Sequence, residues 1–133
     1  MVIENELKKL VNQLRHDEVA QIRLGNSDIT VKVFDHGSQL SLTTSIYYGG
    51  NFIPKSVRRC IAGKSPFDSG WVTTNITVDE QNFQIYLNYQ EKMNDLSNLK
   101  FKDLLEEFSW QADEWRLYLD EHDKNDLVHV HVK

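Results

Sequence analysis

The stretch WVTTNITVDEQNFQIYLNY, residues 71–89, predicts the clearest structural unit of the chain. Its two halves alternate with a period of two, as strands do when they bury one face. The alternating positions are Val72, Thr74, Ile76 and Val78, then Phe83, Ile85, Leu87 and Tyr89. The polar sequence DEQN at 79–82 lies between them and is typical of a turn. The stretch therefore predicts an antiparallel hairpin with one apolar face on each strand.

Three further strands are predicted upstream of this hairpin. Residues 20–24, 29–33 and 40–48 show the same alternation of apolar and polar side chains. The sequences GNSD at 25–28 and DHGS at 35–38 separate these runs and are rich in turn-forming residues. Because short turns join neighbouring antiparallel strands, this part of the chain predicts a three-stranded meander.

Helical segments flank the predicted strands. Apolar residues recur every three to four positions from Ile3 to Leu14, and again from about Leu99 to Glu121. A short helix is predicted near Pro54, because proline fits the first position of a helix. The order is helix, three strands, short helix, two strands, long helix. It predicts an α+β fold in which helices pack on one face of an antiparallel sheet.

The chain is predicted to form a single domain over residues 1–126. Its 133 residues include only 6 Gly and 2 Pro, and they show no linker or repeat. Residues 127–133 alternate once more and are predicted to form a short C-terminal tail or an edge strand. No apolar run approaches the roughly 20 residues that span a bilayer, and the N-terminus does not resemble a signal peptide. With a single Cys, we expect a reducing, cytosolic setting.

The charge is unevenly distributed along the chain. The formal net charge is −5, which argues against general nucleic-acid binding, since neutralising phosphates requires a basic surface. Residues 103–126 contain nine acidic residues and two cations, whereas residues 55–64 contain four cations and no acidic residue. Such polarity can steer a charged partner.

Cys60 is the first candidate for catalysis. It lies near Arg58, Arg59 and Lys64, and nearby cations favour the reactive thiolate. However, it also falls on the apolar stripe of the short helix, where a small buried side chain fits. We therefore interpret Cys60 as a core residue, because free cysteines are commonly buried.

The C-terminal histidines are the candidate metal ligands. His129 and His131 would share a face of a strand, and with His122 they could bind zinc. Their terminal position and the lack of paired ligand spacing argue against this interpretation. No catalytic residue, metal or cofactor is therefore predicted, and the protein is not expected to be an enzyme.

The chain resembles the class I type III secretion chaperones, the small acidic CesT-like and SycE-like proteins of bacterial pathogens. The resemblance lies in size, acidity and element order, and it extends from Ile3 to about Glu121. It includes the opening LKKLVNQL at 7–14, the hairpin at 71–89 and the closing LLEEFSWQADEWRLYL at 104–119. The nearest subgroup is the gatekeeper-effector chaperones that work as unlike pairs, including the chlamydial ones.

This resemblance implies a binding role in the bacterial cytoplasm. Such chaperones dimerise and hold the N-terminal segment of an effector or gatekeeper protein extended, so that it stays soluble and secretion-competent. The bound segment adds a strand to a sheet edge and lays helices on apolar patches. The resemblance places the effector-binding patches at Ile3, Leu7, Leu10, Val11, Leu14, Val31, Val33, Leu40 and Leu42.

The resemblance also implies a dimer interface on the short helix and the strand after it. Its residues would be Val57, Cys60, Ile61, Val72, Thr74 and Ile76. The four cations of residues 55–64 would repel if two copies met there. A second chaperone subunit with an acidic face would relieve this repulsion, which favours a heterodimer over a homodimer.

Two other functions are considered. The chain could be a regulatory adaptor whose acidic last helix binds a transcription factor or RNA polymerase, a role compatible with that of a chaperone. The contact residues would be Glu106, Glu107, Asp113 and Glu114. A small enzyme is the other alternative, and it would require a pocket at Cys60 or at the C-terminal histidines.

Overall fold

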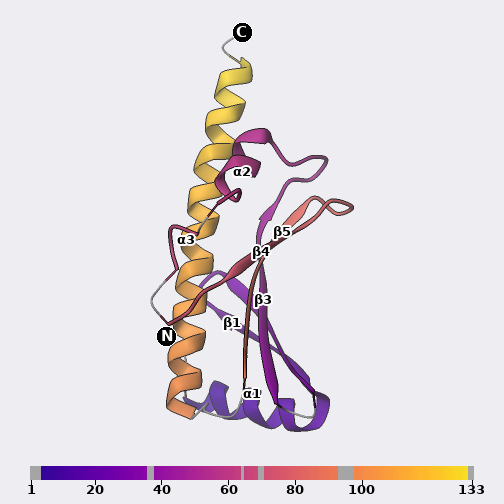
Figure 1. The fold of residues 1–133 in the computed structure, drawn as a ribbon, viewed down its shortest axis with the longest axis vertical. Coiled ribbons are helices and arrows are strands. Elements are labelled where there is room, and N and C mark those ends of the chain that lie inside the picture. Colours follow the sequence, from indigo (N-terminus) through magenta and orange to yellow (C-terminus); the bar gives the residue numbers. More distant parts are fainter. Residues whose placement is uncertain (1–3, 36–37, 64, 69–70, 93–97, 132–133) are drawn as a thin grey trace.

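The computed structural model describes residues 4–35, 38–63, 65–68, 71–92 and 98–131. The elements follow one another as α1 (Glu4–Asp17), β1 (Val19–Leu24), β2 (Ser27–Phe34), β3 (Gln39–Tyr48), α2 (Lys55–Cys60), β4 (Asn75–Asp79), β5 (Gln84–Lys92) and α3 (Asn98–His131). This order confirms the predicted α+β architecture. Figure 1 shows the long helix α3 running along the sheet, with α1 lying across its lower end.

The five strands form one antiparallel sheet in the order β1-β2-β3-β5-β4. The meander and the hairpin meet where β3 pairs with β5, and Leu42 lies opposite Tyr89 there. A bulge between Ser45 and Tyr47 shifts the register near the end of β3. The sheet therefore begins and ends with β1 and β4, each of which pairs with one neighbouring strand among the described residues.

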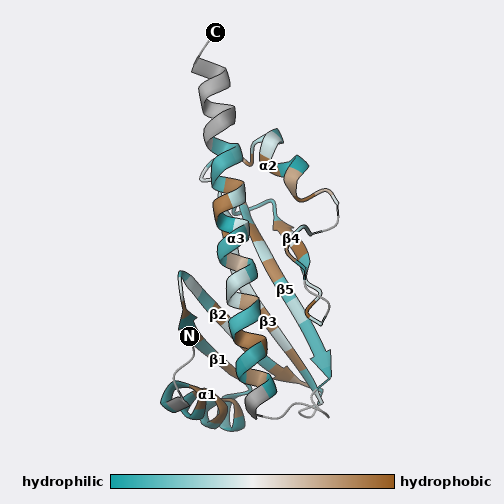
Figure 2. Cartoon of the chain, turned by 90° about the vertical axis from the view of Figure 1, so that its left-hand side faces the viewer, coloured by the Kyte–Doolittle hydropathy of each residue, from teal (hydrophilic) through white to brown (hydrophobic). Residues whose placement is uncertain are grey.

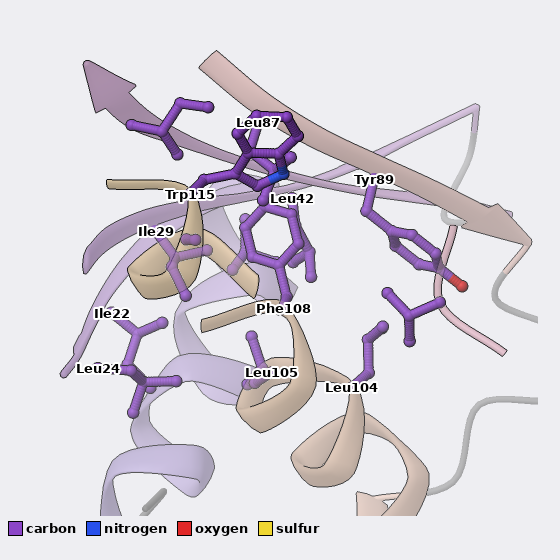
Figure 3. Packing of buried hydrophobic residues seen from close by; sticks show 14 of the residues in the cluster. Ile22, Leu24, Ile29, Leu42, Leu87, Tyr89, Leu104, Leu105, Phe108 and Trp115 are labelled. Carbon is purple, nitrogen blue, oxygen red and sulfur yellow. The ribbon is translucent and has the colours of Figure 1, made fainter. Parts of the chain in front are cut away.

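The core lies between α3 and one face of the sheet. Phe108 and Trp115 of α3 are almost fully buried, and they point toward Leu42 and Leu87 of the sheet (Figure 3). The helix has 34 residues, so it is roughly 50 Å long at 1.5 Å per residue. Figure 2 shows α3 lying across the sheet from β1 to β5.

The structure corrects two element boundaries. Residues 127–131 continue helix α3, where the alternating sequence predicted a tail or an edge strand. A strand needs a neighbour to pair with, and α3 carries this segment beyond the sheet (Figure 1). The first strand of the hairpin begins at Asn75, so Val72 and Thr74 precede it. Both are held by side chains instead: Gln111 Nε2 donates to the Val72 carbonyl, and the Thr74 amide donates to Asp68.

A substitution in α3 should cost much more stability where the side chain faces the core than where it faces solvent. Leu119→Ala removes a side chain that is fully buried in the core, and we expect a loss of about 2–5 kcal/mol in the free energy of unfolding. Leu117→Ala is the matched control, because Leu117 is 67% exposed and should change that free energy by less than about 0.5 kcal/mol. Urea unfolding measures both. Equal losses for the two variants would contradict this arrangement of α3.

Candidate protein-binding surfaces

The predicted effector-binding residues lie mostly in the core, which corrects the expectation of an uncovered apolar patch. Helix α1 packs on β1 and β2, and α3 packs on β2 and β3, so the two helices share one face of the sheet. The buried members of the set are Leu7, Leu10, Leu14, Val31, Leu40 and Leu42. Val11 and Val33 keep part of their surface exposed, and Ile3 lies outside the described residues. A role of this set in effector binding stays a prediction.

An accessible hollow lies over the start of β1, the end of β2 and the neighbouring part of β3. Val19 of β1 and Phe34 of β2 are 39% and 37% exposed. They line a hollow of about 410 Å³ together with Asp17, Glu18, Lys32, Val33 and Ser41. Glu18 has a left-handed backbone with φ 60°, and its carbonyl accepts the Val33 amide at 2.8 Å. This bond ties the junction of α1 and β1 to the adjacent strand and so gives the hollow a fixed wall.

The predicted dimer interface divides into buried and accessible residues. Val57 and Val72 are fully buried in the core, so they present no surface on the single chain. Cys60, Ile61 and Ile76 are partly exposed, as is Thr74. Their contact with a second subunit stays a prediction.

The positive charge of α2 is partly compensated within the chain. Arg58 donates to both carboxylate oxygens of Glu80, at 3.0 and 2.8 Å. These hydrogen bonds lower the pKa of Glu80 and raise that of Arg58. The repulsion expected between two copies of this segment is therefore smaller than the count of four cations suggests.

Cys60 lies in a partly buried setting that favours the neutral thiol. Its Sγ donates to the Ser56 carbonyl at 3.2 Å, and burial raises the pKa of the thiol. The nearby ring of Tyr118 stacks edge-to-face on His122, with ring centroids 4.7 Å apart. The side chains of His129 and His131 lie outside the described ones. Within the described part of the chain, no three His, Cys, Asp or Glu side chains are grouped to bind a metal.

The predicted acidic face of α3 is not uniform. Asp113 accepts a hydrogen bond from Arg116 Nη1 at 3.0 Å, and the same nitrogen donates to Ser27 at 2.6 Å. Arg116 Nη2 donates to the Ser45 carbonyl at 2.7 Å and to Thr44 at 3.2 Å. The guanidinium thus links α3 to β2 and β3, and Asp113 belongs to this link. Sequence periodicity gave no sign of it, although Arg116 is a rare cation in an acidic segment.

Several large apolar side chains on the surface were not assigned to a binding site by the sequence. Trp110 and Leu117 of α3 are 50% and 67% exposed. Trp71, Tyr48 and Phe52 are also exposed. None of the described helices is long and apolar enough to cross a membrane.

Comparison with solved structures identifies the fold. A chain of the ExsC–ExsE complex is 16% identical, with a TM-score of 0.62 over 90% of this chain and 97% of that chain. A chain of the HopA1–SchA chaperone–effector complex is 14% identical, with a TM-score of 0.59 over 85% and 91%. The Yersinia pestis type III secretion chaperone SycH, in complex with a fragment of YscM2, gives a structure match that is 13% identical, with a TM-score of 0.52 over 84% and 97%.

These matches establish a class of fold. The architecture described above is that of the class I type III secretion chaperones, as the resemblance in sequence implied. No protein-family model matches the chain, and the comparison with curated proteins gives no match. The likeness is therefore carried by the arrangement of helices and strands.

The link made by Arg116 should contribute to stability. Arg116→Ala leaves Asp113 and Thr44 without their cationic donor in a partly buried place, and we expect a loss of about 1.5–3 kcal/mol in the free energy of unfolding. Arg23→Ala is the control, because the Arg23–Asp28 pair is exposed and should contribute about 0–1 kcal/mol. Urea unfolding measures both variants. A smaller loss for Arg116→Ala than for Arg23→Ala would refute this role.

The thiol of Cys60 should react slowly in the folded chain. Burial raises its pKa, so less thiolate is present at neutral pH than in an unfolded cysteine. Labelling with a chromogenic disulfide at pH 7 should be at least about tenfold slower than in the same chain unfolded in urea. Equal or faster labelling of the folded chain would show an activated cysteine and would reopen the enzymatic alternative.

Proposed function

We propose that the chain is a type III secretion chaperone of the bacterial cytoplasm. It binds the N-terminal segment of an effector or gatekeeper protein and keeps that segment soluble and secretion-competent. The supporting observation is a class I chaperone fold in which β1 pairs only with β2 among the described strands and lies beside a hollow that Val19, Val33 and Phe34 help to line. Binding alone accounts for this role, so no catalytic step is required.

The β1 edge is the proposed place where the effector segment adds a strand. An edge strand presents unpaired backbone N–H and C=O groups, and an extended peptide can satisfy them. Val19, Val33 and Phe34 then provide a hollow for an apolar side chain of that peptide. Asp17 and Glu18 line the same hollow with one cation, Lys32, so the two carboxylates outnumber it and a basic residue next to the apolar one would be favoured.

The other edge is proposed to face a second chaperone subunit. The strand β4 has five residues, and its exposed Asn75 and Thr77 accept hydrogen bonds from Asn88 of β5. The partly exposed Ile76, Cys60 and Ile61 supply apolar contact area nearby. A heterodimer is the proposed assembly, because Lys55 and Arg59 of α2 have no acidic partner among the described side chains.

A regulatory adaptor function is the second candidate, and it is compatible with the first. The acidic residues of α3 that could contact a transcription factor or RNA polymerase are Glu106, Glu107 and Glu114. Asp113 is engaged with Arg116 and contributes less to such a contact. Charge reversal at Glu107 and Glu114, followed by binding to purified polymerase or regulator, tests this role, and unchanged binding would exclude it.

The proposed effector site is tested by changing the hollow at the β1 edge. A binding partner is first identified by co-purification from the native host, and its N-terminal segment is produced as a peptide. Val19→Ser with Phe34→Ser removes two apolar contacts, and we expect the affinity for this peptide to fall about tenfold or more, since the loss is about 1–3 kcal/mol. Isothermal titration calorimetry measures the change.

A matched control comes from another exposed apolar side chain. Tyr48→Ser removes an aromatic ring that is 68% exposed and lies outside the hollow, so affinity for the peptide should stay within about twofold. Urea unfolding verifies that all variants are folded. If the Val19/Phe34 variant binds the peptide as tightly as the unchanged chain does, the β1 edge is not the effector site.

A further inference from the structure

The outward face of α3 carries two parallel rows of residues. Trp110 and Leu117 form one row, and Glu107, Glu114 and Glu121 form the other. Each row repeats every seven residues, which is about two helical turns, so the rows run side by side along the helix. The opposite face of α3 packs on the sheet. Trp110, Leu117 and Glu121 are exposed, whereas Glu107 and Glu114 are half-buried at the side of the outward face.

The apolar row is exposed and continues onto the neighbouring segment. Trp110 and Leu117 are 50% and 67% exposed. The ring of Phe67 packs edge-to-face on Trp110, with centroids 6.5 Å apart. The hydrogen bond from Gln111 Nε2 to the Val72 carbonyl, at 3.2 Å, holds the chain next to Trp71 against α3. Trp71, the residue before Val72, is itself 47% exposed.

The acidic row is available to cations of another molecule. In the described part of the chain, no ion pair involves Glu107, Glu114 or Glu121. Arg116, on the same helix, is directed toward Asp113 and the strands. Partial burial raises the pKa of Glu107, so a cation placed beside it would relieve an unfavourable environment. A second copy of this chain would bring the same glutamates to this face, and repulsion disfavours it.

We propose that this face, the α3 outer surface (Trp71, Trp110, Leu117, Glu107, Glu114 and Glu121), binds a basic amphipathic helix of a second protein. Apolar residues spaced seven apart on that helix would pack along Trp110 and Leu117. Lysine or arginine residues on its flank would face the three glutamates. This surface goes beyond the proposed effector site, and it deepens the regulatory role proposed for Glu107 and Glu114 by naming the kind of partner helix and the apolar row that would hold it.

The two sites lie at different places in the fold. Trp71 precedes β4, the strand at one end of the sheet order, and the proposed effector site is at β1, the other end. A helix on the α3 outer surface therefore leaves the β1 edge open. The partner is accordingly a protein other than the one held at β1, and both can be bound at once.

The test uses a labelled helical probe peptide and the full chain. The probe is about 21 residues long, or six turns, with leucines at heptad spacing and lysines beside them. Fluorescence anisotropy should show saturable binding, and Trp110→Ala with Leu117→Ala should weaken it at least about tenfold. Glu107→Gln with Glu114→Gln should also weaken binding and reduce its dependence on salt.

Matched controls separate this site from general attraction between a cation and an acidic protein. Glu6→Gln with Asp35→Asn removes the same charge from exposed carboxylates elsewhere, and probe affinity should stay within about twofold. The Val19/Phe34 variant should bind the probe normally, whether or not it loses the effector peptide. A probe with glutamates in place of the lysines should not bind.

Three results would overturn the proposal. The first is no saturable binding of the basic probe to the unchanged chain. The second is equal weakening by the Glu107/Glu114 pair and by the Glu6/Asp35 pair. The third is self-association, seen by sedimentation, that the Trp110/Leu117 variant abolishes, because the surface would then be covered by a second copy.

Discussion

The packing of α3 against one face of the sheet is the constraint on which the rest of the molecule depends. Phe108 and Trp115 fill the space between this helix and strands β3 and β5, and α1 covers the part of the face near β1 (Figure 3). The opposite face of the sheet carries polar side chains: Thr43 donates to Asn88, which in turn donates to Thr77. The apolar side chains Val19 and Phe34 also alternate to that face, where they line the hollow over β1 and β2.

The position of α3 is fixed by polar contacts as well as by the core. Arg116 reaches from the helix to Ser27 of β2 and to the Ser45 carbonyl of β3. At the turn between β1 and β2, Gly25 has φ 57°, and a Cβ added there would lie 2.7 Å from the Asp113 carboxylate. A side chain would thus be excluded from this turn both by the backbone and by the close approach of α3. These contacts hold the meander, and with it the β1 edge, in place relative to the helix.

The order of elements could be predicted from the sequence because period-two and period-3.6 patterns report local structure directly. The exposure of particular residues could not, because it depends on which elements meet. The apolar stripe of α1 packs on β1 and β2. Leu10 and Leu40 are therefore buried, whereas the resemblance implied that they form an open patch. Helix α3 is apolar on more than one side, and only the tertiary structure shows that Trp110 faces outward while Trp115 faces inward.

The start of β4 and the end of α3 differ from the boundaries that the sequence predicted, and in both cases the cause lies in tertiary structure. Val72 and Thr74 continue the alternation of β4 in sequence, but hydrogen bonds to Gln111 and Asp68 hold them outside the ladder. The segment 127–131 alternates as a strand would, yet it continues α3, which carries it beyond the described strands (Figure 1). The β1 hollow likewise had no sequence signal, since Val19, Val33 and Phe34 come together only through strand pairing and the turn at Glu18.

The central claim is that the uncovered edge of this fold serves another polypeptide. Amide hydrogen exchange, followed with and without the bound N-terminal segment of the co-purified partner, tests it most directly. The account predicts that the amides of β1, residues 19–24, exchange markedly more slowly in the complex, while those of β4 change little in the same subunit. Unchanged exchange throughout β1 in a saturated complex would contradict it.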